Sequence, residues 1–452
     1  MSDYLDDATD MKAKLGNSLC LAKWQQTSLH LTNGMTNSCY HPPLHKIDAT
    51  LLEDNPSALH NTPHKKEQRK QMLEGKRPEE CSYCWKTEDA GFMSDRHYRS
   101  GEPWAKVHLN RIENQAWDAD EVPSYVEVNF SNVCNLSCSY CSPQFSSTWA
   151  AQVAQYGAYP TTVPHNDAGY FAKNPVIPNR DDNPYVTAFW KWWPTLYPQL
   201  KHFRMTGGEP LMDKNTYRVF DYVLANPKPD LHLNVTSNFS VEPQLFDTYI
   251  DKVKQLCEGE KIEHFMQFVS VDTWGEQAEY IRNGLNFDRL KANVERYLTE
   301  IPGRNSLTFI ITMNNLVVPN IQKLLEWILE LREKHSTTYQ RVWLDMPLLY
   351  NPQWQALNIL PPAYSYRLEK VKDWMQTNVT QGLMTGFKDY EVDQMRRNLS
   401  WMHNMPKDIQ QRKKDFYRFF NEYDRRTGKS FIKTFPEMAI LWDECRYLEE
   451  HA

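Results

Sequence analysis

With 452 residues, of which 41% are hydrophobic and 13% aromatic, the chain is long enough for two or three domains with packed cores. Its formal net charge is −6 and no basic stripe stands out, which argues against nucleic-acid binding as the main task. The N-terminal residues are acidic and lack the apolar segment of a secretion signal, and no run of about 18 apolar residues could cross a membrane. We therefore expect a soluble, cytoplasmic enzyme with neither a nucleic-acid nor a membrane partner.

Four cysteines precede the first strong strand pattern, and they are more typical of metal ligands than of disulfides in a chain without an export signal: Cys20, Cys39, Cys81 and Cys84. The Asn33-Gly34 pair lies between two short alternating runs, which predicts a β-hairpin that returns Cys39 towards Cys20. A helix is predicted over 65–73, before the CxxC pair. Four thiolates from a hairpin and a CxxC pair suit either a structural zinc or a fully ligated iron–sulfur cluster.

Three further cysteines, Cys134, Cys138 and Cys141, have CxxxCxxC spacing directly after a predicted buried strand over 125–130. Thiolates this close on one loop can converge on one metal centre. Because three of them cannot close a four-ligand site, one coordination position stays open for another molecule. Cys257 and Cys445 have no ligand partner in the sequence pattern, and we expect them to be ordinary thiols.

From about residue 123 to 350, strand-like and helix-like runs alternate, which predicts βαβ units and a parallel sheet of class α/β. Six strands are expected, over 125–130, 202–205, 231–236, 265–271, 307–311 and 342–349. The helices between them are expected over 146–156, 188–197, 215–224, 244–257, 288–298 and 321–334. The stretch over 160–184, rich in Pro, Asn and Asp, predicts an irregular insertion of the kind that forms lids or binding loops.

The C-terminal region is helical by composition, with helices expected over 367–376, 390–401 and 407–424. We expect this region to cover the open side of the preceding sheet. The predicted domains are therefore a Cys-rich domain over 1–118, an α/β domain over 119–350 and a helical extension over 351–452.

Polar side chains lie where the predicted strands end, which is the edge that carries the chemistry in α/β barrels. After the second strand, Gly207 and Gly208 let the backbone approach a ligand, and Glu209 can accept a hydrogen bond from an ammonium group. Hydroxyl, amide and carboxylate side chains that suit ribose hydroxyls or a carboxylate end the next three strands: Asn238, Ser270, Asp272 and Asn314.

In combination these motifs resemble the radical S-adenosylmethionine (radical SAM) superfamily, whose signature is CxxxCx(aromatic)C, with Tyr140 in the aromatic place. The resemblance implies a partial (β/α)6 barrel of the TIM type. It also implies a 4Fe-4S cluster on Cys134, Cys138 and Cys141, whose open iron is chelated by the amino and carboxylate groups of SAM. The residues implied in SAM binding are Tyr140, Gly207, Gly208, Glu209, Asn238, Ser270, Asp272, Arg282 and Asn314.

The N-terminal cysteines are similar to twitch and SPASM domains, because the spacing from Cys20 through Gly34 to Cys39 matches their opening pattern. Those domains usually follow the barrel, whereas here the pattern precedes it, and four cysteines instead of seven match the shorter twitch form. The resemblance favours one auxiliary 4Fe-4S cluster, with structural zinc as the alternative, on Cys20, Cys39, Cys81 and Cys84.

The implied activity is reductive cleavage of SAM to a 5′-deoxyadenosyl radical that abstracts hydrogen from a substrate, with a flavodoxin or ferredoxin as reductant. Twitch and SPASM relatives often modify peptides, so peptide or protein modification is the first expectation. A radical SAM enzyme acting on a small molecule is the alternative within this chemistry, and a non-catalytic zinc-binding scaffold is the alternative from another class. The sequence identifies no catalytic acid or base.

Overall fold

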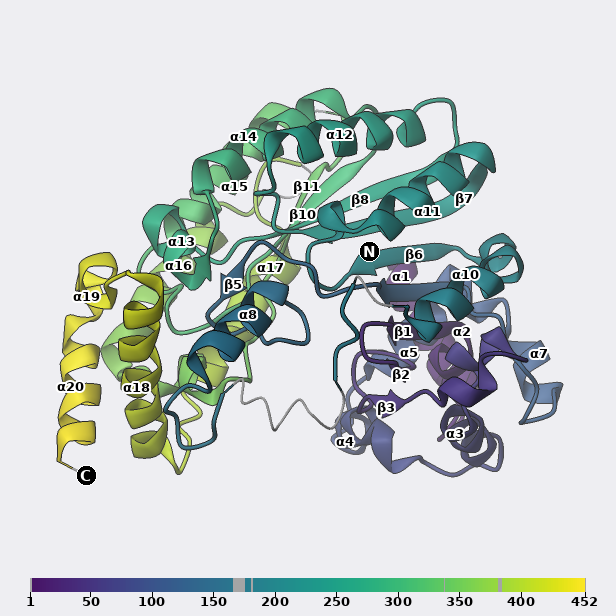
Figure 1. Ribbon diagram of the computed structural model, residues 1–452. Coiled ribbons are helices and arrows are strands. Elements are labelled where there is room, and N and C mark those ends of the chain that lie inside the picture. The colour runs from purple at the N-terminus through teal and green to yellow at the C-terminus, as the bar shows by residue number, and fades with distance from the viewer. Residues whose placement is uncertain (1, 166–174, 180–181, 337, 381–383, 452) are drawn as a thin grey trace. The chain divides into compact units, whose positions relative to one another are not determined.

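The computed structural model describes residues 2–165, 175–179, 182–336, 338–380 and 384–451. It is a mixed α/β structure with many helices and one large sheet (Figure 1). The strands of this sheet are β1 (Gln26–His30), β2 (Met35–Asn37), β3 (His45–Lys46), β4 (Tyr125–Asn129), β6 (His202–Thr206), β7 (Lys228–Ser237), β8 (Ile262–Ser270), β10 (Ser306–Ile310) and β11 (Val342–Asp345). The expected α/β class is therefore confirmed, whereas the partial barrel and the domain boundaries stay predictions.

Residue contacts divide the chain into two compact units. Unit 1 comprises Met1–Asn132, Val176–Gly207 and Asn226–Asn234, and unit 2 comprises Val133–Pro175, Gly208–Ala225 and Val235–Ala452. The strand order is β11-β10-β8-β7-β6-β4-β1-β2-β3, and β7 contributes residues to both units. All six strands expected from the alternating pattern are present, although the last one ends at Asp345 and not at 349.

In unit 1, β1 pairs with β2 in an antiparallel hairpin, as the Asn33-Gly34 pattern predicts. The other edge of β1 pairs in parallel with β4, from Gln26 opposite Tyr125 to His30 opposite Asn129. β4 in turn pairs in parallel with β6. The Cys-rich N-terminal region thus adds three strands to the sheet that contains the strand of the CxxxCxxC motif.

The helices of unit 1 lie mostly in its N-terminal part: α1 (Ser2–Lys14), α2 (Ala22–Gln25), α3 (Pro63–Leu73), α4 (Ser82–Asp89), α5 (Asp95–Gly101), α6 (Pro103–Lys106), α7 (Leu109–Asn114) and α10 (Pro184–Leu196). The sequence pattern predicts α3 and most of α10. It does not predict α1 or the short helices α4 to α7, whose few residues give no clear periodicity. A buried core packs Cys81 and Cys84 with Trp24, Trp85 and Trp104.

In unit 2, the strand pairs β8–β10 and β10–β11 are parallel. Figure 1 shows α12 (Pro243–Cys257), α14 (Phe287–Glu300) and α15 (Ile321–His335) along one side of these strands. Two further helices of this part are α11 (Lys214–Ala225) and α13 (Gly275–Ile281). The sequence pattern predicts α11, α12, α14 and α15 but not the seven-residue α13.

The C-terminal region consists of α16 (Pro362–Thr377), α17 (Asp389–Met402), α18 (Ile409–Thr427), α19 (Phe431–Thr434) and α20 (Ala439–Glu450). The first three confirm the expected helices, and α20 was not expected. On α18, the Tyr423 hydroxyl donates to the Tyr280 carbonyl of α13 at 3.0 Å. Within the expected insertion over 160–184, residues 166–174 and 180–181 lie outside the described part of the chain.

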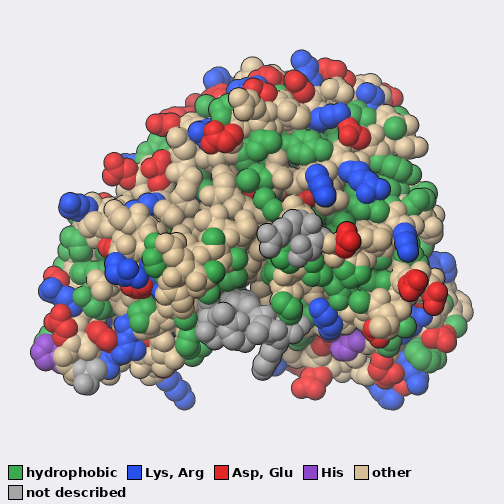
Figure 2. Space-filling view, viewed as in Figure 1, with side chains coloured by type: hydrophobic (Ala, Val, Ile, Leu, Met, Phe, Trp, Pro, Cys, Tyr) green, Lys and Arg blue, Asp and Glu red, His purple; other side chains and the backbone are tan. Residues whose placement is uncertain are grey.

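Charged side chains of both signs are interspersed over the face drawn in Figure 2. Around α12 and α14 they form ion pairs, such as Lys252 with Asp221 and Arg296 with Asp247. No helix among the described residues is long and apolar enough to span a membrane.

Candidate metal and cofactor centres

The loop with the CxxxCxxC motif is held by α8 (Ser147–Tyr156), which follows it. Ser146 caps this helix, because its side chain accepts a hydrogen bond from the Trp149 amide. The Trp149 indole in turn donates to the Cys138 carbonyl at 2.8 Å, and the Cys134 amide donates to the Ser147 hydroxyl at 3.1 Å. The first turn of α8 therefore fixes the backbone at two of the three cysteines.

A second set of contacts fixes the loop from the other side. β5 (Ser137–Cys138) pairs with β9 (Arg282–Asn283) in a small antiparallel sheet that places Cys138 opposite Arg282. The Arg282 guanidinium donates to the Cys138 sulfur at 3.8 Å. The family resemblance implies Arg282 in the site, but the pairing could not be predicted, because two-residue strands carry no periodic pattern.

Of the three cysteines of this loop, Cys138 is buried, and Cys134 and Cys141 are half-buried. Burial raises the pKa of Cys138, and the positive charge of Arg282 counteracts the rise. Burial also raises the pKa of Cys141 to about 12, with a further contribution from the charge of Cys138. Thiols with raised pKa values stay protonated unless a metal ion displaces their protons.

Asp272 is the centre of a hydrogen-bonded network next to these thiols. It is completely buried, and its two oxygens accept from Arg282 at 2.9 and 3.0 Å. The Tyr140 hydroxyl donates to it at 2.8 Å, and the Thr312 amide at 3.1 Å. Three predicted site residues, Tyr140, Asp272 and Arg282, are thus brought together, and they bind one another.

Glu209 is buried in the turn after β6, where it caps the short 3-10 helix η5 (Pro210–Met212). One carboxylate oxygen accepts from the Leu211 amide at 3.0 Å and the other from the Asn238 amide at 2.7 Å. Burial raises the pKa of Glu209 to about 7, although these hydrogen bonds favour its charged form. The Glu209 amide donates to the Val133 carbonyl at 2.6 Å. The turn with the sequence Gly-Gly-Glu-Pro over 207–210, which we call the GGEP turn, is thus joined to the residue before Cys134.

The remaining predicted residues serve mainly in turns. Asn238 accepts from the Ser240 amide and donates to the Asn135 side chain, each at 2.8 Å. Asn314, fully buried, donates to the Thr312 carbonyl and accepts from the Leu316 amide, each at 2.9 Å. Ser270 ends β8.

The two glycines of the GGEP turn lie in different units, Gly207 in unit 1 and Gly208 in unit 2. Gly207 has φ +115, and a Cβ atom built on it would lie 2.1 Å from the Asn129 side-chain oxygen. Only glycine fits there, because a side chain would be both strained and in collision.

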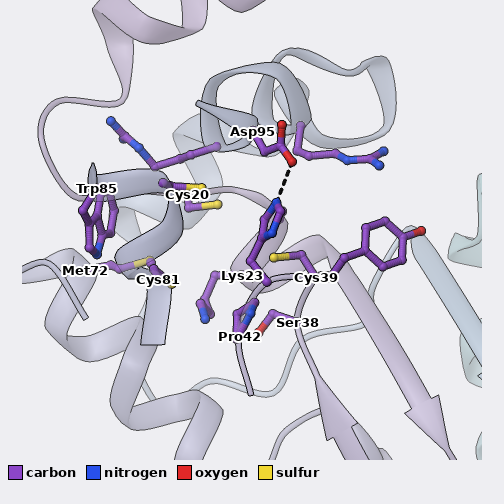
Figure 3. Close-up of a pocket in the computed structure, with 15 residues that line it drawn as sticks. Cys20, Lys23, Ser38, Cys39, Pro42, Met72, Cys81, Trp85 and Asp95 are labelled. Atoms are coloured by element: carbon purple, nitrogen blue, oxygen red, sulfur yellow. Dashed lines mark hydrogen bonds and ion pairs between the residues drawn. The ribbon is translucent and has the colours of Figure 1, made fainter. Parts of the chain in front are cut away.

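The four N-terminal cysteines line one pocket in unit 1 (Figure 3). Cys20 precedes α2, Cys39 follows β2, Cys81 ends the 3-10 helix η3 (Glu79–Cys81) and Cys84 lies in α4. Figure 3 shows Cys20, Cys39 and Cys81 around the Lys23 side chain. The hairpin and the CxxC pair therefore meet, as the spacing predicts.

Buried cations surround this pocket. Lys23 is 2% exposed and donates to Glu80 at 2.5 Å, and Arg96 is 3% exposed and pairs with Glu88 at 2.7 Å. Burial opposes the charge of Lys23, but the negative charges of Cys81 and Glu80 hold its pKa above the ordinary value. No sequence pattern indicates Lys23 at this pocket. For Arg96 the sequence favours a solvated polar connector, which is wrong, because Arg96 is buried.

The donor chemistry fits a thiolate-bound metal centre at both places. Four thiolates bound to zinc or to an iron–sulfur cluster would leave excess negative charge, which the buried Lys23 and Arg96 would offset. Among the described residues, however, no three His, Cys, Asp or Glu side chains already form a group that could hold a metal ion. The structure therefore brings the cysteines of each set into one place without arranging them as a finished coordination sphere.

Comparisons with known proteins give little beyond this geometry. No protein-family model and no curated protein sequence matches the chain. Among solved structures, the crystal structure of SuiB from Streptococcus suis is similar with a TM-score of 0.36 and 13% identity, over 79% of this chain and 69% of that one. A similarity at this level assigns neither a fold nor an activity.

Proposed function

We propose that the chain is a radical SAM enzyme in which Cys134, Cys138 and Cys141 hold a 4Fe-4S cluster. One observation carries the proposal: the loop with three thiols is fixed on one side by α8 and on the other by the β5–β9 pairing. A loop fixed in this way keeps three ligands together and leaves one coordination position for a small molecule.

When bound, such a cluster supplies the electron that splits a carbon–sulfur bond of SAM, and the protein contributes binding, orientation and exclusion of water. Arg282 is oriented by its two hydrogen bonds to Asp272, so that it presents a fixed positive charge to the Cys138 sulfur. Glu209 would provide a buried carboxylate for the ammonium group of the cofactor. Tyr140 keeps the Asp272 carboxylate in position from the loop itself.

We further propose that Cys20, Cys39, Cys81 and Cys84 hold an auxiliary 4Fe-4S cluster. The pocket that they share and its buried cations support a fully ligated site with excess negative charge. Zinc on the same four thiolates would carry similar charge, so metal analysis decides between them. A fully ligated cluster has no position for substrate, and its role would be electron transfer.

The substrate that we propose is a peptide or a protein, and the reductant a flavodoxin or ferredoxin. A small-molecule substrate is the alternative within the same chemistry.

The test is anaerobic reconstitution with iron and sulfide, followed by metal analysis and measurement of 5′-deoxyadenosine after reduction with SAM present. We expect about eight irons per chain if both clusters form. Cys138→Ala should abolish 5′-deoxyadenosine formation and reduce the iron content by about half. Cys257→Ala changes a cysteine of α12 that belongs to neither cysteine set, and it should leave 5′-deoxyadenosine formation and iron content unchanged. Full cleavage of SAM by the Cys138→Ala protein would rule out the proposed cluster site, and stoichiometric zinc without SAM cleavage would favour a zinc-binding scaffold.

A further inference from the structure

Unit 1 contains a cleft that has no part in the proposed metal sites. Its volume is about 410 Å³, within the range of about 300–1,000 Å³ that is typical of ligand pockets. Three segments form its walls: the stretch over 50–61 with the 3-10 helices η1 (Ala49–Leu51) and η2 (Pro56–Leu59), the N-terminal half of α3, and the segment after α7. The cysteines of unit 1 are not among the described residues that line the cleft.

Hydrogen bonds within unit 1 hold the walls of the cleft in place. Asn55 caps η2, because its side chain accepts a hydrogen bond from the Ser57 amide at 3.0 Å. Asn61 lines the cleft and is 4% exposed; its side chain accepts from Arg69 of α3 at 3.0 Å and from the Glu121 amide at 2.9 Å. The cleft is therefore formed in advance, and a ligand can enter it without the cost of ordering a loop.

Each of the three segments contributes a carboxylate to the cleft, from Asp54, Glu67 and Asp118. Lys66 also lines it, but its ammonium group pairs with Asp120 at 2.6 Å, so its charge is already offset. In the part of the chain that the structure describes, no basic side chain forms an ion pair with the three carboxylates. Single solvated carboxylates are ordinary on a protein surface, whereas these three surround one hollow. The cleft therefore has an excess of negative charge and attracts cations.

The spacing of the carboxylates and the apolar surface between them favour an organic cation over a metal ion. Among the described residues, no three His, Cys, Asp or Glu side chains lie close enough to hold one metal ion, so these carboxylates are spread around the cleft. Leu51 and Trp117 also line it, and each is 40% exposed. An indole ring attracts ammonium groups, and the Lys70 ammonium already lies 4.9 Å from the centre of the Trp117 ring.

We propose that this cleft binds a free aliphatic diamine or polyamine. Ammonium groups spaced along a chain can meet carboxylates on different segments, while the methylene groups between them pack on Leu51 and Trp117. A compact dication cannot reach carboxylates that are spread apart, and an anion is repelled. The site goes beyond the proposed radical chemistry, because it shares no lining residue with the cysteine pocket of the same unit.

The test measures binding of 1,5-diaminopentane to the full-length protein by isothermal titration calorimetry at low ionic strength. Three comparison probes separate the contributions: 1,5-pentanediol has hydroxyls in place of the ammonium groups, magnesium carries the same charge in compact form, and N-acetyl-lysine amide represents a lysine of another protein. We expect saturable binding of the diamine and at least tenfold weaker binding of each comparison probe. Added sodium chloride should weaken binding of the diamine, because salt screens the charges.

Matched variants locate the site. The double substitution Asp54→Asn and Asp118→Asn should weaken diamine binding at least fivefold, whereas Asp6→Asn, which removes an exposed carboxylate from α1 of the same unit, should not. All three positions are exposed, so the variants should keep the melting temperature of the wild type. The proposal is overturned if the diamine shows no saturable binding at millimolar concentration, if any comparison probe binds as tightly, or if the double variant binds like Asp6→Asn. None of these readouts needs a metal centre or SAM cleavage.

Discussion

At the scale of single residues, the ion pair between Arg332 and Glu391 is the clearest example of buried charges that stabilise the fold. Neither side chain is exposed, and two hydrogen bonds of 2.5 and 3.0 Å join them. Arg332 also donates to the carbonyls of Val342 and Gly386, so it links α15, β11 and the segment before α17. Removing one partner would leave an uncompensated buried charge.

We therefore expect Glu391→Ala to lower the free energy of unfolding by about 3–5 kcal/mol. Urea unfolding followed by tryptophan fluorescence measures the change. Glu369→Ala, which removes a 45% exposed carboxylate from α16, should change it by less than about 0.5 kcal/mol. Equal changes in the free energy of unfolding for the two substitutions would show that the buried ion pair stabilises the fold no more than an exposed carboxylate does.

A second residue-scale prediction concerns acid stability. Burial, with the charges of Lys65 and His64, lowers the pKa of His45 to about 3. Between pH 6.5 and 3 the unfolded chain binds a proton at this position and the folded chain does not, so stability is lost as the pH falls. When the pH is lowered from 7.5 to 5, the free energy of unfolding of His45→Gln should therefore fall by about 1–2 kcal/mol less than that of the wild type. Urea unfolding at the two pH values measures the difference. His451→Gln, at an exposed position, should behave like the wild type.

At the scale of secondary-structure elements, the parallel pairing of β1 with β4 ties the N-terminal region to the rest of unit 1. The sequence pattern predicts residues 1–118 as a separate Cys-rich domain. The structure shows five consecutive residue pairs between β1 and β4, so the hairpin occupies an edge that β4 would otherwise leave open. An open edge strand is a template for aggregation.

We expect a fragment of residues 119–452 to be insoluble when expressed alone, because β4 loses the strand beside it. Co-expression with residues 1–118 should restore part of the material to the soluble fraction. Soluble, monomeric 119–452, measured by centrifugation and size-exclusion chromatography, would contradict this prediction.

The same scale explains what the sequence could predict. Helices such as α12, α14 and α15 have long amphipathic patterns that identify them in the sequence. Most of the six strands of the alternating pattern are at least five residues long and rich in apolar residues, so they too can be identified. β5 and β9 have two residues each and exist only because they pair with each other. The contact between Arg282 and Cys138 depends on that pairing, and no local pattern could reveal it.

At the scale of the whole molecule, seven of the nine cysteines divide into two sets that the sequence spacing already separates, one in each unit. The motifs predict which thiols lie together, but they do not predict the buried cations, because Lys23 and Arg96 look like ordinary surface residues in the sequence. Whether a lysine is buried depends on the packing of segments far apart in the chain, such as Glu80 against Lys23.

From this charge distribution we expect metal removal to destabilise the protein. Without thiolates to offset them, Lys23 and Arg96 keep only Glu80 and Glu88 as partners. Chelation should lower the melting temperature by at least about 5 °C. Cys81→Ser should lower it without chelator and should respond less to chelator, because only the proposed site on Cys134, Cys138 and Cys141 remains. Cys445→Ser, which changes a buried thiol outside both sets, should retain the response to chelator. Differential scanning fluorimetry measures the melting temperature of the wild type, of the chelated protein and of the two variants.

The pairing of β1 with β4 also has a consequence for synthesis. Gln26 and Tyr125 are neighbours in the sheet although about a hundred residues separate them in the chain. At roughly 5–20 residues per second, the ribosome releases the hairpin about 5–20 seconds before its partner strand emerges. During that interval the hairpin, which carries polar side chains and lies near thiols, has no neighbouring strand at one edge. Assembly of the N-terminal cysteine pocket therefore depends on when a later segment is translated, and that segment contains none of the cysteines of the pocket.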